Sequence, residues 1–112
     1  ALRNIGGVDA IEALAAAYSS KSALLKHEIA YVMGQMQDSH AVPHLIERLR
    51  DMEEDVMVRH EAAEALGAIG DRKALGVLEE FKDDRDIVVA ESCEVALDLL
   101  EWVASKRLNY SE

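Results

Sequence analysis

The sequence contains one cysteine, one proline and five aromatic side chains among its 112 residues, and each scarcity excludes a class of protein. The single cysteine, Cys93, cannot form a disulfide within the chain, which argues against a secreted disulfide scaffold and for a cytoplasmic location. Few aromatic residues beside abundant Ala and Leu favour helices over sheets. No apolar run approaches the roughly 18 residues of a membrane span, and the first residues do not resemble a signal peptide. We therefore expect a soluble protein without a membrane partner.

Positive charge is also scarce, because 12 basic residues face 22 acidic ones and the net charge is −10. Such a surface repels phosphate backbones, and the sequence has no concentrated basic patch, so we expect no nucleic-acid partner. A cationic partner or substrate fits this charge. A solvated acidic surface that only aids solubility fits it equally well.

The most informative pattern is a duplicated dipeptide, His27-Glu28 and His60-Glu61, each preceded by a basic residue. Residues 58–71 align with residues 25–38 at an offset of 33, and a third copy at residues 89–97 follows at a further offset of 31. A repeat of this period predicts stacked helix pairs.

An earlier amphipathic helix is expected before each of these copies, at residues 8–18, 40–50 and 73–82. Short polar breaks separate the elements. The predicted fold class is all-α, an α-solenoid (superhelix) of helix pairs. We expect one domain over residues 1–112, divided into a remnant at 1–7 and repeats at about 8–38, 39–71 and 72–112.

The paired histidines suggest a metal site. Equivalent positions on adjacent packed helices lie about 8 to 10 Å apart, axis to axis, so the His27 and His60 imidazoles can share one ion. A neighbouring glutamate would complete the two-histidine, one-carboxylate set of non-haem Fe(II) enzymes. Adjacent residues point about 100° apart on a helix, so one of Glu28 and Glu61 is expected to serve another role. Zinc is the alternative metal. One His-Glu pair alone would be explained by helix-dipole and surface effects, but two in the same register are not.

Two resemblances extend this interpretation. Val58-Arg59 followed by Ala62 and Ala65-Leu66-Gly67 resembles HEAT-like repeats, in which the second helix of each pair lines a concave face. The longer stretches Leu24-Leu25-Lys26-His27-Glu28, Met57-Val58-Arg59-His60-Glu61-Ala62 and Glu91-Ser92-Cys93-Glu94-Val95-Ala96-Leu97 are similar to the deoxyhypusine hydroxylase family. That resemblance covers nearly all of this chain and, by our expectation, the C-terminal half of the enzyme.

The second resemblance implies roles for individual residues. His27, His60 and Glu61 would ligate one Fe(II) ion, of the two that a complete site holds. Glu28 is placed in two roles, as a further metal-ligating carboxylate and as the contact for the substrate's cationic amine. Met57 would line the substrate pocket, although a flexible core filler explains it equally well.

The same resemblance implies the reaction and its partners. The parent enzyme would be a non-haem di-iron monooxygenase of hypusine biosynthesis, using dioxygen to hydroxylate the deoxyhypusine side chain of eukaryotic translation initiation factor five-A. The complementary half or a second copy would supply the other ligands, so the isolated chain is expected to be inactive. The competing hypothesis is a non-catalytic HEAT-like protein-interaction module. Near the end of the chain, Trp102 and Tyr110 are expected to cover the last core layer, with a contact to the missing half as the alternative.

Overall fold

A computed structural model describes residues 7–19 and 22–111 of the chain. The remnant predicted at residues 1–7 therefore lies outside the described residues, except for Gly7. All regular elements in the described ranges are helices, as the sequence predicts. None of the described helices is long and apolar enough to cross a membrane.

The helices are arranged in pairs, and short turns connect them. In chain order they are α2 (Gly7–Ala16), η1 (Ala17–Ser19), α3 (Ala23–Met36), η2 (Ser39–Ala41), α4 (Val42–Arg50), α5 (Val56–Ile69), η3 (Arg72–Ala74), α6 (Leu75–Phe81) and α7 (Ile87–Ser111). The first helices predicted for each pair correspond to α2 with η1, α4 with η2, and α6 with η3. The short 3-10 turns account for the predicted starts of the second and third of these helices.

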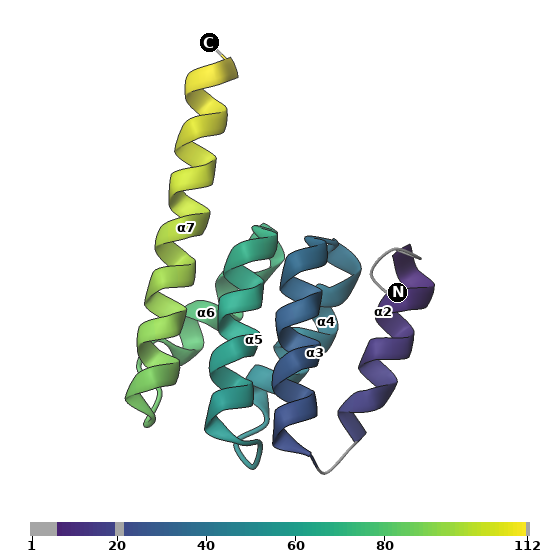
Figure 1. The fold of residues 1–112 in the computed structure, drawn as a ribbon. Helices are drawn as coiled ribbons and strands as arrows, with labels where there is room; N and C mark the ends of the chain where they lie inside the picture. The colour runs from purple at the N-terminus through teal and green to yellow at the C-terminus, as the bar shows by residue number, and fades with distance from the viewer. Residues whose placement is uncertain (1–6, 20–21, 112) are drawn as a thin grey trace.

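Figure 1 shows α3, α5 and α7 side by side as one layer, with α4 and α6 behind them. Helix α5 packs against both α3 and α7, whereas α4 and α6 each pack against the inner helix that follows in the chain. Helix α2 stands at the N-terminal edge and contacts α3. This two-layered row of helix pairs is an α-solenoid, so residues repeated on successive inner helices become neighbours.

Local sequence signals fix the ends of the inner helices. Ser22 caps α3 by accepting a hydrogen bond from the Leu25 N–H, and Asp55 caps α5 by accepting one from the Met57 N–H. Helix α5 ends at Gly70, whose φ of 74° lies in the left-handed region that glycine adopts without strain. These boundaries place both His-Glu dipeptides in the first half of an inner helix.

Glycine and alanine bring the inner helices into close contact. A Cβ atom added at Gly34 on α3 would lie 3.1 Å from the Cα atom of Ala65 on α5. One added at Gly67 on α5 would lie 2.9 Å from the Cβ atom of Ala96 on α7. The same small-residue contact thus recurs at both junctions and sets the spacing on which the site depends.

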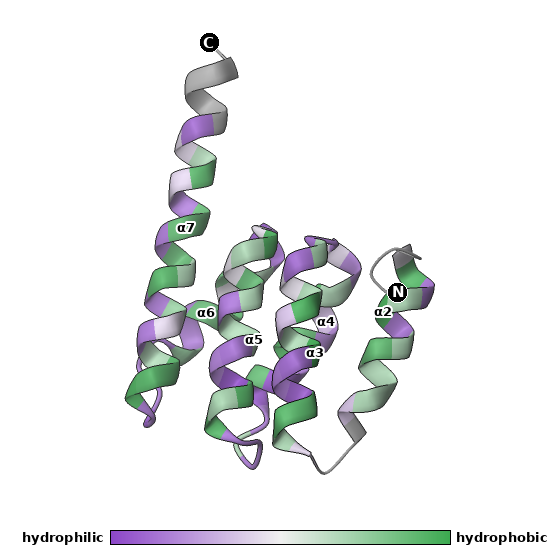
Figure 2. Cartoon of the chain, in the orientation of Figure 1, coloured by the Kyte–Doolittle hydropathy of each residue, from purple (hydrophilic) through white to green (hydrophobic). Residues whose placement is uncertain are grey.

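Helix α7 is longer than the other inner helices and projects past their ends (Figure 1), and it carries apolar residues that remain exposed. Leu100 is buried and closes the core, but Val95, Leu99 and Trp102 are at least 43% exposed. The prediction that Trp102 covers the last core layer is therefore wrong, because Leu100, two residues earlier and on nearly the opposite side of the helix, occupies that position. The side chain of Tyr110 lies outside the described part. Figure 2 shows the mixture of apolar and polar segments along α7.

Candidate metal centre

Two imidazoles from neighbouring inner helices approach one carboxylate oxygen. His27 on α3 places its Nε2 atom 3.0 Å from Oε1 of Glu61 on α5. The Nε2 atom of His60, also on α5, lies 3.6 Å from the same oxygen. The Glu61 side chain is only 12% exposed, so the three groups meet in a partly desolvated position. The structure thus brings together three of the four residues predicted as metal ligands.

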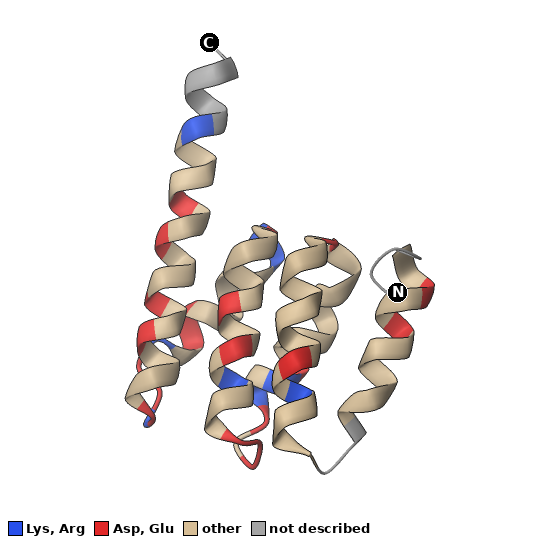
Figure 3. Cartoon of the chain, in the orientation of Figure 1, with Lys and Arg blue, Asp and Glu red and all other residues tan. Residues whose placement is uncertain are grey.

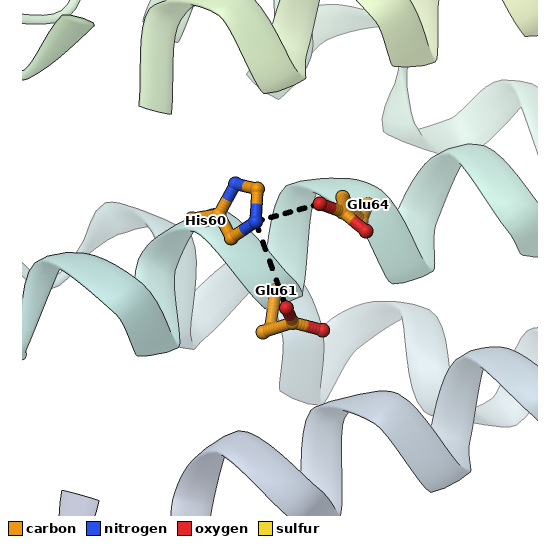
Figure 4. Close-up of side chains that lie close together, drawn as sticks. All are labelled: His60, Glu61 and Glu64. Atoms are coloured by element: carbon orange, nitrogen blue, oxygen red, sulfur yellow. Dashed lines mark ion pairs between the residues drawn. The ribbon is translucent and has the colours of Figure 1, made fainter. Parts of the chain in front are cut away.

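A second carboxylate, which the comparison of repeats did not single out, joins this cluster. Oε1 of Glu64 lies 2.6 Å from Nε2 of His60, one turn earlier on the same helix. Figure 4 shows the His60 ring beside both carboxylates. Ligand-type atoms of His60, Glu61 and Glu64 all lie within 4.8 Å of one another, the one such group in the described ranges. The i, i+4 spacing of His60 and Glu64 is the sequence signal that could have identified Glu64.

The basic residue before each histidine takes part in a partly or fully buried ion pair. Nζ of Lys26 lies 3.1 Å from Oε1 of Glu54, whose side chain is 4% exposed. Nη2 of Arg59 lies 2.6 Å from Oδ2 of Asp84, and both side chains are 1% exposed. Each acidic partner belongs to the turn that precedes the next inner helix. The basic residue therefore ties its own helix to the next one, while the following histidine faces the cluster.

Hydrogen bonds keep the Arg59 pair charged. Arg59 donates to both carboxylate oxygens of Asp84 and, through Nε, to the carbonyl oxygen of Leu49. These bonds from Arg59 are the main reason that the pKa of the Asp84 carboxyl lies below its ordinary value, against the opposing effect of burial. The positive charge of Arg59 is thus balanced by Asp84 and not by the glutamates beside the histidines.

The cluster itself contains two carboxylates and neither a lysine nor an arginine. In the part of the chain that the structure describes, Glu61 and Glu64 form ion pairs with histidines only. Figure 3 shows acidic segments on the visible side of α3, α5 and α7. Two carboxylates without a fixed lysine or arginine partner are suited to a cation, whether a metal ion or an amine.

The third repeat contributes a hydroxyl that sequence comparison also missed. Oγ of Ser92 on α7 lies 2.5 Å from Nδ1 of His60 and 2.7 Å from the carbonyl oxygen of Val88. Ser92 occupies the repeat position equivalent to Glu61, where a glutamate would be needed to continue the His-Glu pattern. The third repeat therefore lacks a His-Glu pair, and its Ser92 instead contacts His60 of the second repeat.

The two residues assigned to substrate are both exposed. Glu28 is exposed on α3 and is not part of the group of ligand-type atoms described above. Met57 is 43% exposed, so the core-filler interpretation is wrong. It lines a shallow pocket of about 300 Å³ together with His27, Leu24 and Asp55. Met57 and one predicted ligand thus border the same space.

A larger groove of about 460 Å³ runs along α5 and α7. Its apolar walls are formed by Ala68, Val88, Val95, Ala96 and Leu99, and its polar lining by His60, Glu64, Glu91 and Ser92. The groove therefore combines aliphatic walls with carboxylates, an arrangement that accommodates an aliphatic chain ending in a cation.

Comparison with known proteins gives a consistent family. A family model described as HEAT repeats matches residues 11–98. Deoxyhypusine hydroxylase from Drosophila melanogaster is 54% identical over 104 residues, which represent 93% of this chain and 34% of that protein. The human deoxyhypusine hydroxylase is 51% identical over 102 residues, or 91% of this chain and 34% of that one. A solved structure of human deoxyhypusine hydroxylase in complex with glycerol matches with a TM-score of 0.91 at 50% identity, covering 94% of this chain and 36% of that chain.

The chain thus spans about one third of the length of the curated relatives it matches, less than the half expected from the sequence. The resemblance to deoxyhypusine hydroxylase drawn from the His-Glu motifs is confirmed by these identities. The HEAT-repeat match covers most of the chain, and the helix pairs agree with it. The chain therefore belongs to the HEAT-repeat family and is similar, over nearly its whole length, to deoxyhypusine hydroxylases.

Proposed function

We propose that this chain supplies one iron site of a deoxyhypusine monooxygenase, which uses dioxygen to hydroxylate the deoxyhypusine side chain of eukaryotic translation initiation factor five-A. The observation that carries the proposal is the approach of His27 and His60 to a single oxygen of Glu61. Relatives at about 50% identity that are named for this hydroxylase support the reaction.

The donor set fits Fe(II) in chemistry, and each histidine lies close to Glu61, while His27 stands outside the group of ligand atoms that all lie within 4.8 Å of one another. Two imidazole nitrogens and a carboxylate oxygen form the set typical of non-haem iron sites with open positions. Ligands held at about 2.1 Å around one ion lie about 3 Å apart when their directions are at right angles. The separations of 3.0 and 3.6 Å from Glu61 to His27 and His60 are close to this value. Bound iron would supply the activation of dioxygen.

The remaining residues would bind and orient the substrate. Glu28 would pair with the cationic amine of the deoxyhypusine side chain, and Met57 would line its path beside His27. The aliphatic walls of the α5–α7 groove would hold methylene groups and exclude water from them. The net charge of −10 would attract a basic substrate over a longer range.

A complete site of this kind requires two irons, and this chain offers one set of ligands. A complementary half of the enzyme or a second copy of the chain would provide the other set. We therefore expect no hydroxylation by the isolated chain. A cytoplasmic location also remains part of this proposal, because a single cysteine suits a reducing compartment.

Metal content tests the proposed site directly. Untagged chain supplied anaerobically with Fe(II) is expected to retain about one iron per chain, held by three protein ligands. The change His27→Ala removes a ligand and should weaken iron binding at least tenfold, the lower end of the loss caused by removing only a supporting residue. His40→Ala is a matched control, since the His40 ring is exposed and pairs with Asp38.

Equal iron retention by wild type and His27→Ala, measured after the same desalting step, would contradict the ligand assignment. The competing interaction-module hypothesis has its own readout. Under that hypothesis, the double variant His27→Ala with His60→Ala still binds its protein partner. Both the double variant and His27→Ala then retain as much iron as wild type.

A further inference from the structure

The hydroxyl of Ser92 lies between two groups whose hydrogen-bonding capacities differ. On one side is the carbonyl oxygen of Val88, four residues earlier on α7, at 2.7 Å. On the other side is Nδ1 of His60, on α5, at 2.5 Å. Ser92 is 7% exposed, so water has little access to compete for either contact.

Counting protons assigns the direction of both hydrogen bonds. A carbonyl oxygen can only accept, and a serine hydroxyl has a single proton to donate. The Ser92 proton is therefore directed at Val88, and the bond to His60 must be donated by the imidazole. It follows that Nδ1 of His60 carries a hydrogen, so in the neutral form of the ring the lone pair is on Nε2.

The other ring nitrogen, Nε2, is the one that faces the cluster. Nε2 of His60 lies 3.6 Å from Oε1 of Glu61 and 2.6 Å from Oε1 of Glu64. A lone pair directed at two carboxylates is unfavourable in itself, but it is the arrangement that a cation between these groups requires. His27 differs, because its Nδ1 atom is buried without a hydrogen-bond partner among the described residues.

Helix α7 is held in the register that makes this contact. The ion pair of Arg59 with Asp84 anchors the turn before α7 to the residue adjacent to His60. Beyond the contact, Ala96 on α7 packs against Gly67 on α5 with no space for a Cβ atom. Ser92 lies between these two fixed points, so its position opposite His60 is set by packing rather than by its own hydrogen bonds.

We infer that Ser92 is a positioning residue that fixes His60 as its Nδ1–H tautomer and thereby presents Nε2 to a metal ion. The metal part of this inference rests on the proposed function, whereas the tautomer does not. The third repeat then has a defined task. It supplies the hydrogen-bond acceptor that orients a ligand of the second repeat.

Nitrogen NMR of the full 112-residue chain tests the tautomer without metal. At a pH above which the His60 resonances no longer change, wild type is expected to show a protonated Nδ1 and an unprotonated Nε2 at His60. Ser92→Ala should shift both resonances toward a mixture of tautomers. Ser92→Thr keeps the hydroxyl and its bond to the i−4 carbonyl, so it should restore the wild-type pattern. Ser105→Ala, at an exposed position of the same helix, is the matched control.

Titration with Zn²⁺, a redox-inert probe of the same ligand type, gives the second readout. Ser92→Ala is expected to bind Zn²⁺ about 10- to 100-fold more weakly than wild type, with Ser92→Thr and Ser105→Ala close to wild type. Circular dichroism of each variant verifies folding.

The inference is overturned if wild-type His60 carries its proton on Nε2, or if Ser92→Ala leaves the His60 resonances unchanged. A wild-type chain with the expected tautomer that binds no metal at His60 would instead refute the proposed function and leave the tautomer assignment standing.

Discussion

Removing the carboxylate of Asp84 is expected to cost about 4 kcal/mol of the free energy of unfolding. Asp84 and Arg59 are each 1% exposed, and breaking such a buried pair costs about 3 to 5 kcal/mol because the remaining charge has no partner. Asp86 lies 3.5 Å from Nη1 of Arg59 and can partly replace Asp84, which favours the lower end of that range. Asp84 also accepts a hydrogen bond from the Asp86 N–H, whose loss adds about 1 kcal/mol.

Urea unfolding followed by circular dichroism measures this loss, and Glu80→Ala is its matched control. Glu80 pairs with Arg50 at 3.4 Å, but both side chains are more than half exposed, so its removal should cost less than about 1 kcal/mol. For a chain of this size, the change Asp84→Ala corresponds to a decrease of about 15 °C in Tm. The double change Arg59→Met with Asp84→Ala should recover part of the loss, since it removes the uncompensated cation.

The pH dependence gives the sign of the effect independently. Because the pKa of Asp84 is lower in the folded chain than its ordinary value, its contribution is complete above about pH 4 and decreases as the pH falls through the folded-state pKa. The stability difference between wild type and Asp84→Ala should therefore be largest near neutral pH and shrink in acid. Equal losses for Asp84→Ala and Glu80→Ala at pH 7, or a difference that grows in acid, would refute this reasoning.

Two other predictions concern packing and reactivity. Gly67→Ala should destabilise the chain by about 1 to 3 kcal/mol, because the new Cβ atom would meet Ala96 at 2.9 Å, whereas Gly76→Ala on α6, with nothing within 4 Å, should stabilise it by about 0.4 to 1 kcal/mol. Urea midpoints that move in the same direction for both variants would contradict this assignment of space. Burial raises the pKa of the Cys93 thiol to about 12, so a disulfide reagent at pH 8 should label it only when the chain is unfolded. Rapid stoichiometric labelling of the native chain would show that the thiol is accessible.

Repetition in the sequence accounts for what could be predicted of the site. His27 and His60 share one register, and stacking of repeats places equivalent residues on adjacent helices, so their proximity follows from the offset of 33. Which glutamate contacts the two histidines also depends on the direction of its side chain. The Glu61 side chain reaches His27, whereas Glu28 is exposed. The extent of α7 could not be predicted, because no glycine or proline marks its end.

Residues that differ between repeats were the ones that comparison missed. Glu64 is equivalent to Tyr31, and Ser92 to Glu61, so neither position shows a repeated residue type. Each acts through a contact found in one repeat only: Glu64 contacts His60 along α5, and Ser92 contacts His60 from α7. Aligning the repeats identifies residues that recur at equivalent positions, and it does not identify a functional residue that occurs in one repeat only.

Two contacts of the proposed site, His27 with Glu61 and His60 with Ser92, cross a boundary between repeats. In a linear array, stability is a sum of the intrinsic stability of each repeat and a coupling energy between nearest neighbours. His27 with Glu61, and His60 with Ser92, contribute to the coupling energy alone. A cation bound between α3 and α5 would therefore make these repeats unfold as one cooperative unit, and at 100 times its Kd would add about 2.7 kcal/mol. Loss of the cation would lower that cooperativity first, before any single repeat lost its helices.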